Sequence, residues 1–323
     1  VVDEEHESSY KSDMTPEYDA VDAAVERGKI DGAVVILGTA TPSVVSKYRA
    51  FCGEYSEILL TERYNKTPLP NISIADMRKE LRSGNRSIFS RDLYRKSLRA
   101  LEAGKQVIFF LNRRGYASFI SCRSCGFVLK CEVCGISMTY HQTSGMAECH
   151  YCGRRTAVPH ICPSCGSRYI RQFGIGTEKV EEMAKIAFPD RTVGRLDLDT
   201  ARRKGESEKI LSAFRRGKTD ILVGTQLVAK GLDFQNVGVV GIISADVTMN
   251  IPDYRSSERT FQLITQAAGR AGRGTETGEV VIQTYSPDEA AIRCAAAGDY
   301  EGFYRRELRL RSLGGYPPFT NII

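Results

Sequence analysis

The stretch VIFFL (Val107–Leu111) is an unbroken apolar run, as is typical of a strand that is buried on both faces of a parallel sheet. Similar runs recur at Ala33–Leu37, Ile221–Val223, Val237–Ile243 and Val280–Tyr285. Segments with apolar residues at helical spacing lie between them, at Ser90–Gly104, Glu178–Phe188, Glu206–Arg216 and Ser256–Arg270. Strands that alternate with helices predict an α/β fold, with a parallel sheet and helices on both of its faces.

The composition is that of an ordinary globular chain. Its 323 residues suffice for two domains, and 42% hydrophobic with 26% charged residues exclude wholesale disorder. No apolar run reaches the roughly 18 residues that a membrane helix needs. The net charge of +6 permits a nucleic-acid partner without requiring one. Because Val1-Val2 looks like the end of a buried strand, we expect a fragment that begins inside a domain.

Eight of the ten cysteines form four CxxC pairs, each followed by glycine. Two such knuckles supply the four thiolates of one tetrahedral zinc site. The sequence therefore predicts two zinc sites. Cys52 and Cys294 are isolated, and we expect them to be small core residues.

The pairing of the knuckles is less tightly determined. Gly126–Lys130, between the first two pairs, is too short to fold back comfortably. We therefore favour nested pairing, with an outer site of Cys122, Cys125, Cys162 and Cys165 and an inner site of Cys131, Cys134, Cys149 and Cys152. Crossed pairing, first with third and second with fourth, stays open. His141, His150 and His160 could replace a cysteine, but eight thiolates already complete two sites.

Two segments near the N-terminus follow predicted strands. DEEH (Asp3–His6) offers one carboxylate that can hold nucleotide-bound Mg²⁺ and a second that can orient or deprotonate the attacking water. GTATPS (Gly38–Ser43) comes directly after the next strand. Taken alone, the first segment could be a surface acidic cluster and the second a simple strand-to-helix turn.

Two further segments carry phosphate-binding chemistry. VGTQLVAKGLDF (Val223–Phe234) leaves a strand end with hydroxyl, amide and backbone N–H groups that suit phosphates. In QAAGRAGR (Gln266–Arg273), Arg270 and Arg273 are three residues apart, so one helical turn presents both guanidinium groups on one face. This pair suits a triphosphate, although a solvated basic helix end is the alternative.

In this order, the four segments resemble motifs II, III, V and VI of the superfamily 2 helicases. The cysteine insertion narrows the resemblance to the PriA family of primosomal replication-restart helicases. FFLNRRGY (Phe109–Tyr116), GIGTE (Gly174–Glu178) and YPPF (Tyr316–Phe319) are also similar to that family. The resemblance covers essentially the whole chain.

The resemblance implies an ATP-dependent 3′→5′ DNA helicase or translocase that acts at stalled or abandoned replication forks and initiates primosome assembly. Its cofactors would be two Zn²⁺ and ATP with Mg²⁺. Its partners would be forked and single-stranded DNA, primosome proteins and single-strand-binding protein, in the bacterial cytoplasm and without a membrane. A non-enzymatic zinc-ribbon adaptor for DNA or proteins is the alternative.

The resemblance also implies roles for single residues. Asp3 binds Mg²⁺, Glu4 is the catalytic carboxylate, and His6 with Thr39 couples the nucleotide state to DNA. The remaining assignments are the γ-phosphate contacts Gln266, Arg270 and Arg273, the further nucleotide-binding residues Gly231 and Asp233, and the DNA-phosphate contacts Thr225, Arg113 and Arg114.

Two departures from the family matter. The loop after DEEH reads PEYDAV (Pro16–Val21) and lacks the basic residues usual there, which leaves Tyr10 and Tyr18 for base stacking. No Walker A loop, G-x-x-x-x-G-K-[ST], is present: Gly217-Lys218-Thr219 has Ser212 at the first glycine position and follows a predicted helix. We therefore expect the isolated fragment to be incompetent in ATP hydrolysis.

The domain organisation follows from these assignments. We expect 1–63 to be the C-terminal part of a first RecA-like lobe, 64–89 a linker, 90–120 with 171–315 a second RecA-like lobe, 121–170 the zinc-binding insertion, and 316–323 the start of a truncated domain.

Overall fold

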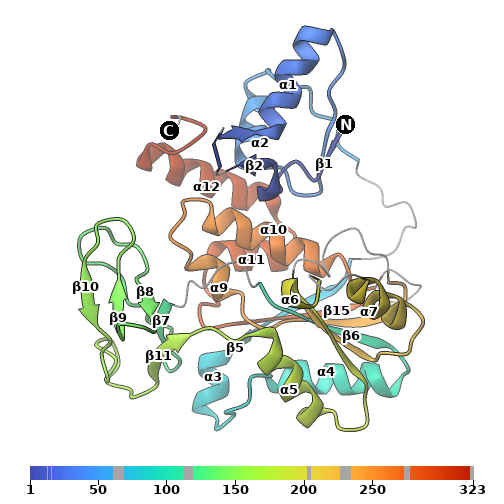
Figure 1. Ribbon diagram of the computed structural model, residues 1–323, viewed down its shortest axis with the longest axis vertical. Coiled ribbons are helices and arrows are strands. Elements are labelled where there is room, and N and C mark those ends of the chain that lie inside the picture. The colour runs from blue at the N-terminus through green and yellow to red at the C-terminus, as the bar shows by residue number, and fades with distance from the viewer. Residues whose placement is uncertain are drawn as a thin grey trace. The chain divides into compact units, whose positions relative to one another are not determined.

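The computed structural model describes residues 1–12, 14–15, 17–60, 69–112, 119–201, 205–225, 234–272 and 277–320. It divides into two compact units (Figure 1): a first unit of Val1–Thr61 with Tyr300–Ile323, and a second unit of Glu62–Asp299. None of the helices in these ranges combines the length and the apolar character that crossing a membrane requires.

The second unit is built on a six-stranded sheet in which all neighbouring strands are parallel. In spatial order the strands are β12 (Val193–Leu196), β13 (Ile221–Gly224), β6 (Gln106–Phe110), β14 (Val237–Ile242), β15 (Glu279–Thr284) and β5 (Asn71–Asp76). Helices cover both faces of the sheet (Figure 1). The predicted α/β fold with a parallel sheet is therefore confirmed, and the apolar runs of this unit are strands to within a residue.

The four predicted helices of the second unit, which are α4 (Arg91–Glu102), α5 (Thr177–Ala187), α7 (Glu206–Arg215) and α10 (Ser256–Ala268), begin and end close to the predicted positions. Ser90 caps the first long helix, where its Oγ accepts the Leu93 N–H at 3.2 Å, and Gly104 adopts a left-handed conformation just beyond its end. The other described helices of this unit are α3 (Met77–Arg82), α6 (Leu198–Ala201), α9 (Asp246–Met249) and α11 (Ala290–Ala297).

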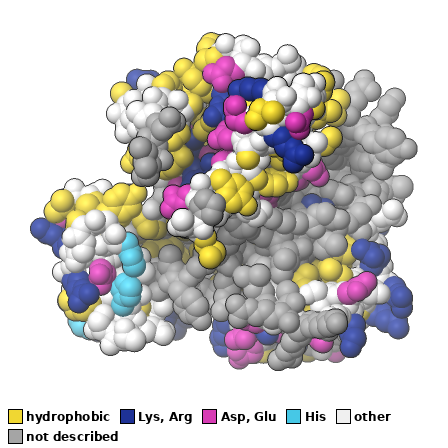
Figure 2. Space-filling model, turned by 45° about the horizontal axis from the view of Figure 1, so that its top comes forward, with side chains coloured by type: hydrophobic (Ala, Val, Ile, Leu, Met, Phe, Trp, Pro, Cys, Tyr) yellow, Lys and Arg dark blue, Asp and Glu magenta, His cyan; other side chains and the backbone are white. Residues whose placement is uncertain are grey.

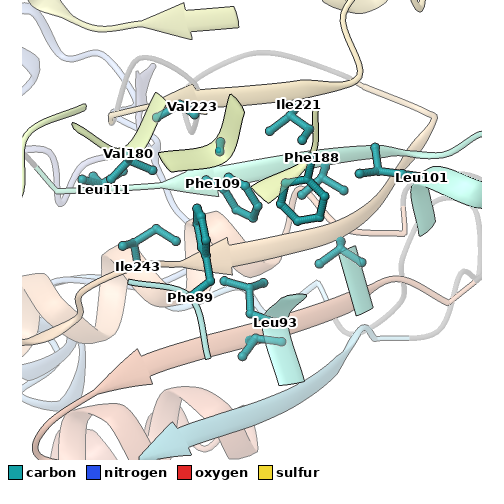
Figure 3. Close-up of a cluster of buried hydrophobic side chains, with 14 residues drawn as sticks. Phe89, Leu93, Leu101, Phe109, Leu111, Val180, Phe188, Ile221, Val223 and Ile243 are labelled. Carbon is teal, nitrogen blue, oxygen red and sulfur yellow. The ribbon is translucent and has the colours of Figure 1, made fainter. Parts of the chain in front are cut away.

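One core cluster holds α4 and α5 against the sheet (Figure 3). The rings of Phe89 and Phe109 lie 4.8 Å apart between centroids, and those of Phe109 and Phe188 lie 6.1 Å apart. Leu93 from α4 is fully buried in the same cluster. Phe109 therefore packs between a residue just before α4 and a residue just after α5. Val107 and Leu111 belong to the same cluster, and Ile108 and Phe110 are buried as well, which explains why β6 is apolar at every position after Gln106.

The cysteine-rich segment forms a separate five-stranded antiparallel sheet within the second unit. Its strands, in spatial order, are β10 (Arg155–Ala157), β9 (Met146–Glu148), β8 (Thr139–His141), β7 (Phe119–Cys122) and β11 (Ile170–Phe173). Strands β7 and β11 pair with each other and form the stem (Figure 1). The predicted cysteine-rich insertion into an α/β unit is confirmed.

The predicted linker over 64–89 differs from the structure. Asn71–Asp76 forms edge strand β5, paired with β15 from Asn71 opposite Glu279 to Asp76 opposite Thr284, and Met77–Arg82 forms helix α3. Pro70 precedes the strand, where a missing N–H costs no ladder hydrogen bond. The proline therefore marks the start of an edge strand here, and the linker interpretation of residues 71–82 is wrong.

The first unit contains a short parallel pair, β1 (Val2–Asp3) with β4 (Leu37–Gly38). The expected strand at Ala33–Leu37 is thus shorter and less buried: Val34 and Ile36 are exposed, since within the described part of the chain only β1 pairs with this segment. The other elements are α1 (Ala20–Asp31), α2 (Val44–Phe51), α12 (Tyr300–Gly314), the 3-10 turn Ser8–Tyr10, and the antiparallel pair β2 (Lys11–Ser12) and β3 (Tyr18–Asp19).

Helix α12 lies in the first unit, although the second lobe was expected to extend to residue 315. Lys47 of α2 forms an ion pair with Glu301 at 3.1 Å, and the Tyr300 hydroxyl donates to the Pro42 carbonyl at 2.9 Å. The ring centroids of Tyr48 and Phe319 are 5.3 Å apart. These contacts with α2 explain the difference, because nothing in the local pattern of α12 specifies the surface on which it packs.

Replacement of Gly241 by alanine is expected to destabilise the second unit. A Cβ at this position of β14 would lie 2.7 Å from both methyl carbons of buried Leu93, and such overpacking costs about 1–3 kcal/mol in free energy of unfolding. Gly176→Ala is the matched control, because nothing lies within 4 Å of its Cβ position. Urea denaturation of the two variants provides the measurement, and equal midpoints would contradict this account of the core.

Candidate metal centres and strand-end sites

The four CxxC segments share one backbone geometry. In each, the N–H of the following glycine donates to the carbonyl of the first cysteine at 2.8–2.9 Å. The four glycines Gly126, Gly135, Gly153 and Gly166 have φ between 69° and 82°, a left-handed conformation that favours glycine. The glycine after each pair is therefore what allows the loop to close beneath the two sulfurs.

The structure brings the eight sulfurs together in the nested grouping, not in the crossed one. The outer cluster contains Cys122, Cys125, Cys162 and Cys165, the inner cluster contains Cys131, Cys134, Cys149 and Cys152, and the sulfurs within each lie within 4.8 Å of one another. Individual contacts are 3.7 Å for Cys122–Cys165 and 3.6 Å for Cys131–Cys152. A tetrahedral zinc ion about 2.3 Å from each sulfur requires sulfurs about 3.8 Å apart. The donor sets therefore fit zinc.

The surroundings of the sulfurs set their charge. N–H groups of Cys134 and Val133 point at the sulfur of Cys131 and lower the pKa of that thiol to about 7. The Ser167 N–H likewise lowers the pKa of Cys165. Burial acts in the other direction and raises the pKa of Cys125 to about 12. Four thiolates this close need a compensating cation, which a divalent metal supplies.

The other cysteines and the histidines lie outside both clusters. The rings of His141 and His150 lie 5.2 Å apart, and Figure 2 shows histidine side chains gathered on the surface. Cys294 is half-buried. Cys52 is exposed, so the prediction that Cys52 is a core residue is wrong. Cys52 is the C-cap of helix α2, directly before Gly53, and lies at the surface.

The outer cluster is docked on the end of strand β15. A Cβ at Gly126 would lie only 2.5 Å from the Tyr285 carbonyl oxygen. Arg123 Nε donates to the Tyr285 hydroxyl at 2.8 Å, and the Phe173 ring meets the Tyr285 ring edge-on at 5.3 Å. Sequence reasoning missed this interface, because a contact between residues 126 and 285 leaves no local signal.

Buried polar side chains follow three adjacent strands of the six-stranded sheet. Asn112 comes after β6, Thr225 after β13 and Ser244 after β14, and each is at most 8% exposed. Asn112 donates to the Thr248 hydroxyl at 2.6 Å. Its Oδ1 and the Ser244 hydroxyl have no hydrogen-bond partner among the described residues. Thr225 was predicted as a site residue, whereas Asn112 and Ser244 were missed, although each is a polar residue just past an apolar run.

Asp246 anchors the same edge. Its carboxylate accepts the Thr284 hydroxyl at 3.0 Å and the Tyr285 N–H at 3.0 Å. Burial raises the pKa of this carboxyl above its ordinary value. The ends of β14 and β15 are thus joined, directly beside the residue on which the cysteine module docks.

Of the remaining predicted site residues of the second unit, the structure describes Gln266 and Arg270. Gln266 is half-buried in the last turn of α10, and Arg270 follows that helix with 9% of its surface exposed. Five predicted residues lie outside the described ranges: Arg113, Arg114, Gly231, Asp233 and Arg273.

In the first unit the structure brings Asp3, Glu4, His6 and Thr39 together at the carboxyl ends of β1 and β4. His6 Nδ1 and Thr39 Oγ1 are 2.7 Å apart, and His6 Nδ1 lies 3.6 Å from the Glu4 carboxylate. Among the described residues other than glycine, Glu4 alone has positive φ, at 50°. Such a conformation costs about 1–3 kcal/mol and is concentrated at functional sites.

Comparisons with known proteins agree with these observations. A model of the helicase conserved C-terminal domain matches residues 172–275, and a model of the PriA DNA helicase Cys-rich region domain matches residues 131–156. The replication restart protein PriA of Bacillus subtilis is 50% identical over 319 residues, 99% of this chain. That of Synechocystis sp. is 45% identical over 333 residues and all of this chain. The chain spans 40% of the length of each of these relatives.

Among solved structures, RecG bound to a three-way DNA junction aligns with 88% of this chain and 28% of that chain, with a TM-score of 0.45 and 13% identity.

Removal of the inner thiolates is expected to release one zinc ion. The paired replacements Cys149→Ser and Cys152→Ser leave two of four sulfurs in the inner cluster, too few for a structural site. The zinc content, measured by atomic emission, should fall from two ions per chain to one. Cys52→Ser with Cys294→Ser is the matched control and should keep both ions. Retention of two ions by the first variant would contradict the assignment.

Gly126→Ala is expected to loosen the cysteine module. The substitution carries the cost of a left-handed alanine, about 1–2 kcal/mol, and adds overpacking against the Tyr285 carbonyl of about 1–3 kcal/mol. Gly135→Ala is the control, because it occupies the same knuckle position with nothing within 4 Å. The midpoint temperature of thermal unfolding should fall more for Gly126→Ala than for Gly135→Ala. Equal shifts would show that the docking contributes nothing.

Proposed function

Because the chain belongs to the PriA family of replication restart proteins, we propose that it forms the core of an ATP-dependent 3′→5′ DNA helicase or translocase. The enzyme acts at stalled or abandoned replication forks and initiates primosome assembly in the bacterial cytoplasm. Its DNA partners are forked and single-stranded DNA, and its protein partners are primosome proteins and single-strand-binding protein.

The observation that carries this proposal is the geometry around Glu4. Its left-handed backbone follows Asp3 at the end of β1, and its Oε2 lies 3.6 Å from His6 Nδ1, which is hydrogen-bonded with Thr39. That oxygen is buried and has no hydrogen-bond partner among the described residues. Asp3 holds Mg²⁺, which supplies positive charge at the phosphate oxygens when bound. Glu4 orients or deprotonates the water that attacks the γ-phosphate. His6 and Thr39 link the two segments and so couple the nucleotide state to DNA.

Residues of the second unit complete the assignment. Gln266, Arg270 and Arg273 contact the γ-phosphate, where arginine stabilises the charge that develops in the transition state. Gly231 and Asp233 contribute to nucleotide binding.

The strand ends of the second unit form a DNA-binding edge. Thr225, Arg113 and Arg114 contact DNA phosphates, an interaction that is insensitive to sequence and sensitive to salt. The unpartnered groups of Asn112 and Ser244 support this assignment, because Asn112 follows β6, which pairs with the strand before Thr225, and Ser244 follows β14, the next strand along.

The two cysteine clusters hold structural zinc, and the module they stabilise takes part in strand separation and in contacts with primosome proteins. The outer cluster contacts Tyr285 at the end of β15, which supports the proposal that the module and the sheet move together as one body. The chain itself carries no G-x-x-x-x-G-K-[ST] loop. We therefore expect it to hydrolyse ATP poorly or not at all by itself.

The proposal is tested by ATPase activity stimulated by single-stranded DNA. The activity of this chain is compared with that of a longer protein, which contains this chain and is as long as the full-length relatives. We expect activity only in the longer protein, and Glu4→Gln there should lower turnover by about 10²–10⁴-fold without loss of zinc. Glu26→Gln, on the exposed surface of α1, is the matched control and should turn over normally.

Absence of DNA-stimulated turnover from the longer protein would overturn the helicase proposal and favour a zinc-ribbon adaptor. Full activity of Glu4→Gln would remove Glu4 from the catalytic role.

A further inference from the structure

Glu5 is the third residue of the DEEH segment and has no role in the function proposed above. Its side chain is 6% exposed. One carboxylate oxygen accepts the Ser43 N–H at 2.6 Å. The other accepts the Ser43 hydroxyl at 3.1 Å and the Ser46 hydroxyl at 2.9 Å. A carboxylate is thus withdrawn from water and held by three neutral donors, an arrangement too specific for a surface acidic cluster.

The partners of Glu5 are the first residues of helix α2. Ser43 is the N-cap of this helix and accepts the Ser46 N–H at 3.1 Å. The helix N-terminus carries partial positive charge, which stabilises a carboxylate placed there. Glu5 therefore joins the DEEH segment to the helix that follows the GTATPS segment, across 38 residues of sequence.

This link bears directly on Glu4. A non-glycine residue keeps a left-handed backbone only where its surroundings hold it there. On one side of Glu4, Asp3 pairs with Gly38 in the β1–β4 ladder. On the other side, the Glu5 N–H donates to the Gly38 carbonyl at 3.2 Å and the Glu5 side chain is bound to α2. Glu4 is thus held between two fixed neighbours.

We propose that Glu5 is a positioning residue for ATP hydrolysis, which holds the Glu4 carboxylate in its catalytic place by fastening the DEEH segment to the N-terminus of α2. This inference rests on the function proposed above. Glu5 itself does not contact the nucleotide, because both of its oxygens are occupied and its side chain is buried, whereas the Glu4 side chain is 41% exposed.

The substitutions Glu5→Ala and Glu5→Gln separate positioning from chemistry. In the full-length protein, Glu5→Ala should lower kcat for DNA-stimulated ATP hydrolysis by about 10–100-fold, since a displacement of about 1 Å at a reacting group costs this much. The KM for ATP should stay within about threefold, because ground-state binding is untouched. The Glu5→Gln variant should keep most of the wild-type kcat. Its amide oxygen can still accept the Ser43 N–H, and its NH₂ group can donate to the serine hydroxyls.

A milder variant covers the case in which Glu5→Ala does not fold. Ser46→Ala removes one of the three donors and should lower kcat by about two- to fivefold, a fraction of the loss expected on truncation of Glu5. In combination with Glu5→Ala it should add nothing, since the two residues share one interaction. Glu26→Gln again serves as the matched control, and the zinc content checks that the second unit is intact.

Three results would overturn the inference. These are wild-type kcat in Glu5→Ala, a Glu5→Gln variant as inactive as Glu5→Ala, and additive effects of Glu5→Ala and Ser46→Ala. Failure of the proposed function has a different signature, because the full-length protein would then lack ATP turnover before any substitution is made.

Discussion

The dry interior of the parallel sheet is the constraint on which the second unit depends. Val107–Phe110 of β6 are buried on both faces of the sheet, and the strand pairs with β13 on one side and β14 on the other. A polar side chain at these positions would therefore reach neither water nor a ligand. In β13, β6 and β14, which are described in full, the one polar side chain is that of Gln106 at the start of β6. The buried polar groups beyond these strands follow their carboxyl ends, where open α/β sheets gather their ligands. Asn112, Thr225 and Ser244 lie there, and the cysteine module both leaves the sheet after β6 and docks after β15.

The sequence predicted best where local pattern and structure agree. Every long apolar run of the second unit is a strand, and each glycine after a CxxC pair has the left-handed backbone that its loop requires. Prediction failed where tertiary contacts decide. Strand β5 has only partly buried residues beside a proline, so it looked like a linker. The Gly126–Tyr285 contact and the bonds of Glu5 to α2 join residues far apart in sequence, which no local pattern reveals.

The two cysteine clusters share a local geometry but differ in what surrounds them. The outer knuckle at Gly126 abuts the backbone of Tyr285, whereas the equivalent position at Gly135 is open. Asp246 in turn joins Tyr285 to the end of β14. The outer cluster is therefore part of the framework that shapes the strand-end surface. The segment after the inner knuckle contacts the α/β part through the Ser137 hydroxyl, which donates to Asn250 Oδ1 at 3.3 Å.

Helix α12 has a consequence for how the chain is assembled during synthesis. The second unit is one continuous segment, but the first unit combines Val1–Thr61 with Tyr300–Ile323. A ribosome releases residues in order, and domains generally fold as their sequence emerges. The second unit is thus complete before the first can acquire α12, and residues 1–61 must wait through the translation of 238 residues, Glu62–Asp299, for the helix that covers α2. The segment with the candidate catalytic carboxylates is therefore the last part of this chain to mature.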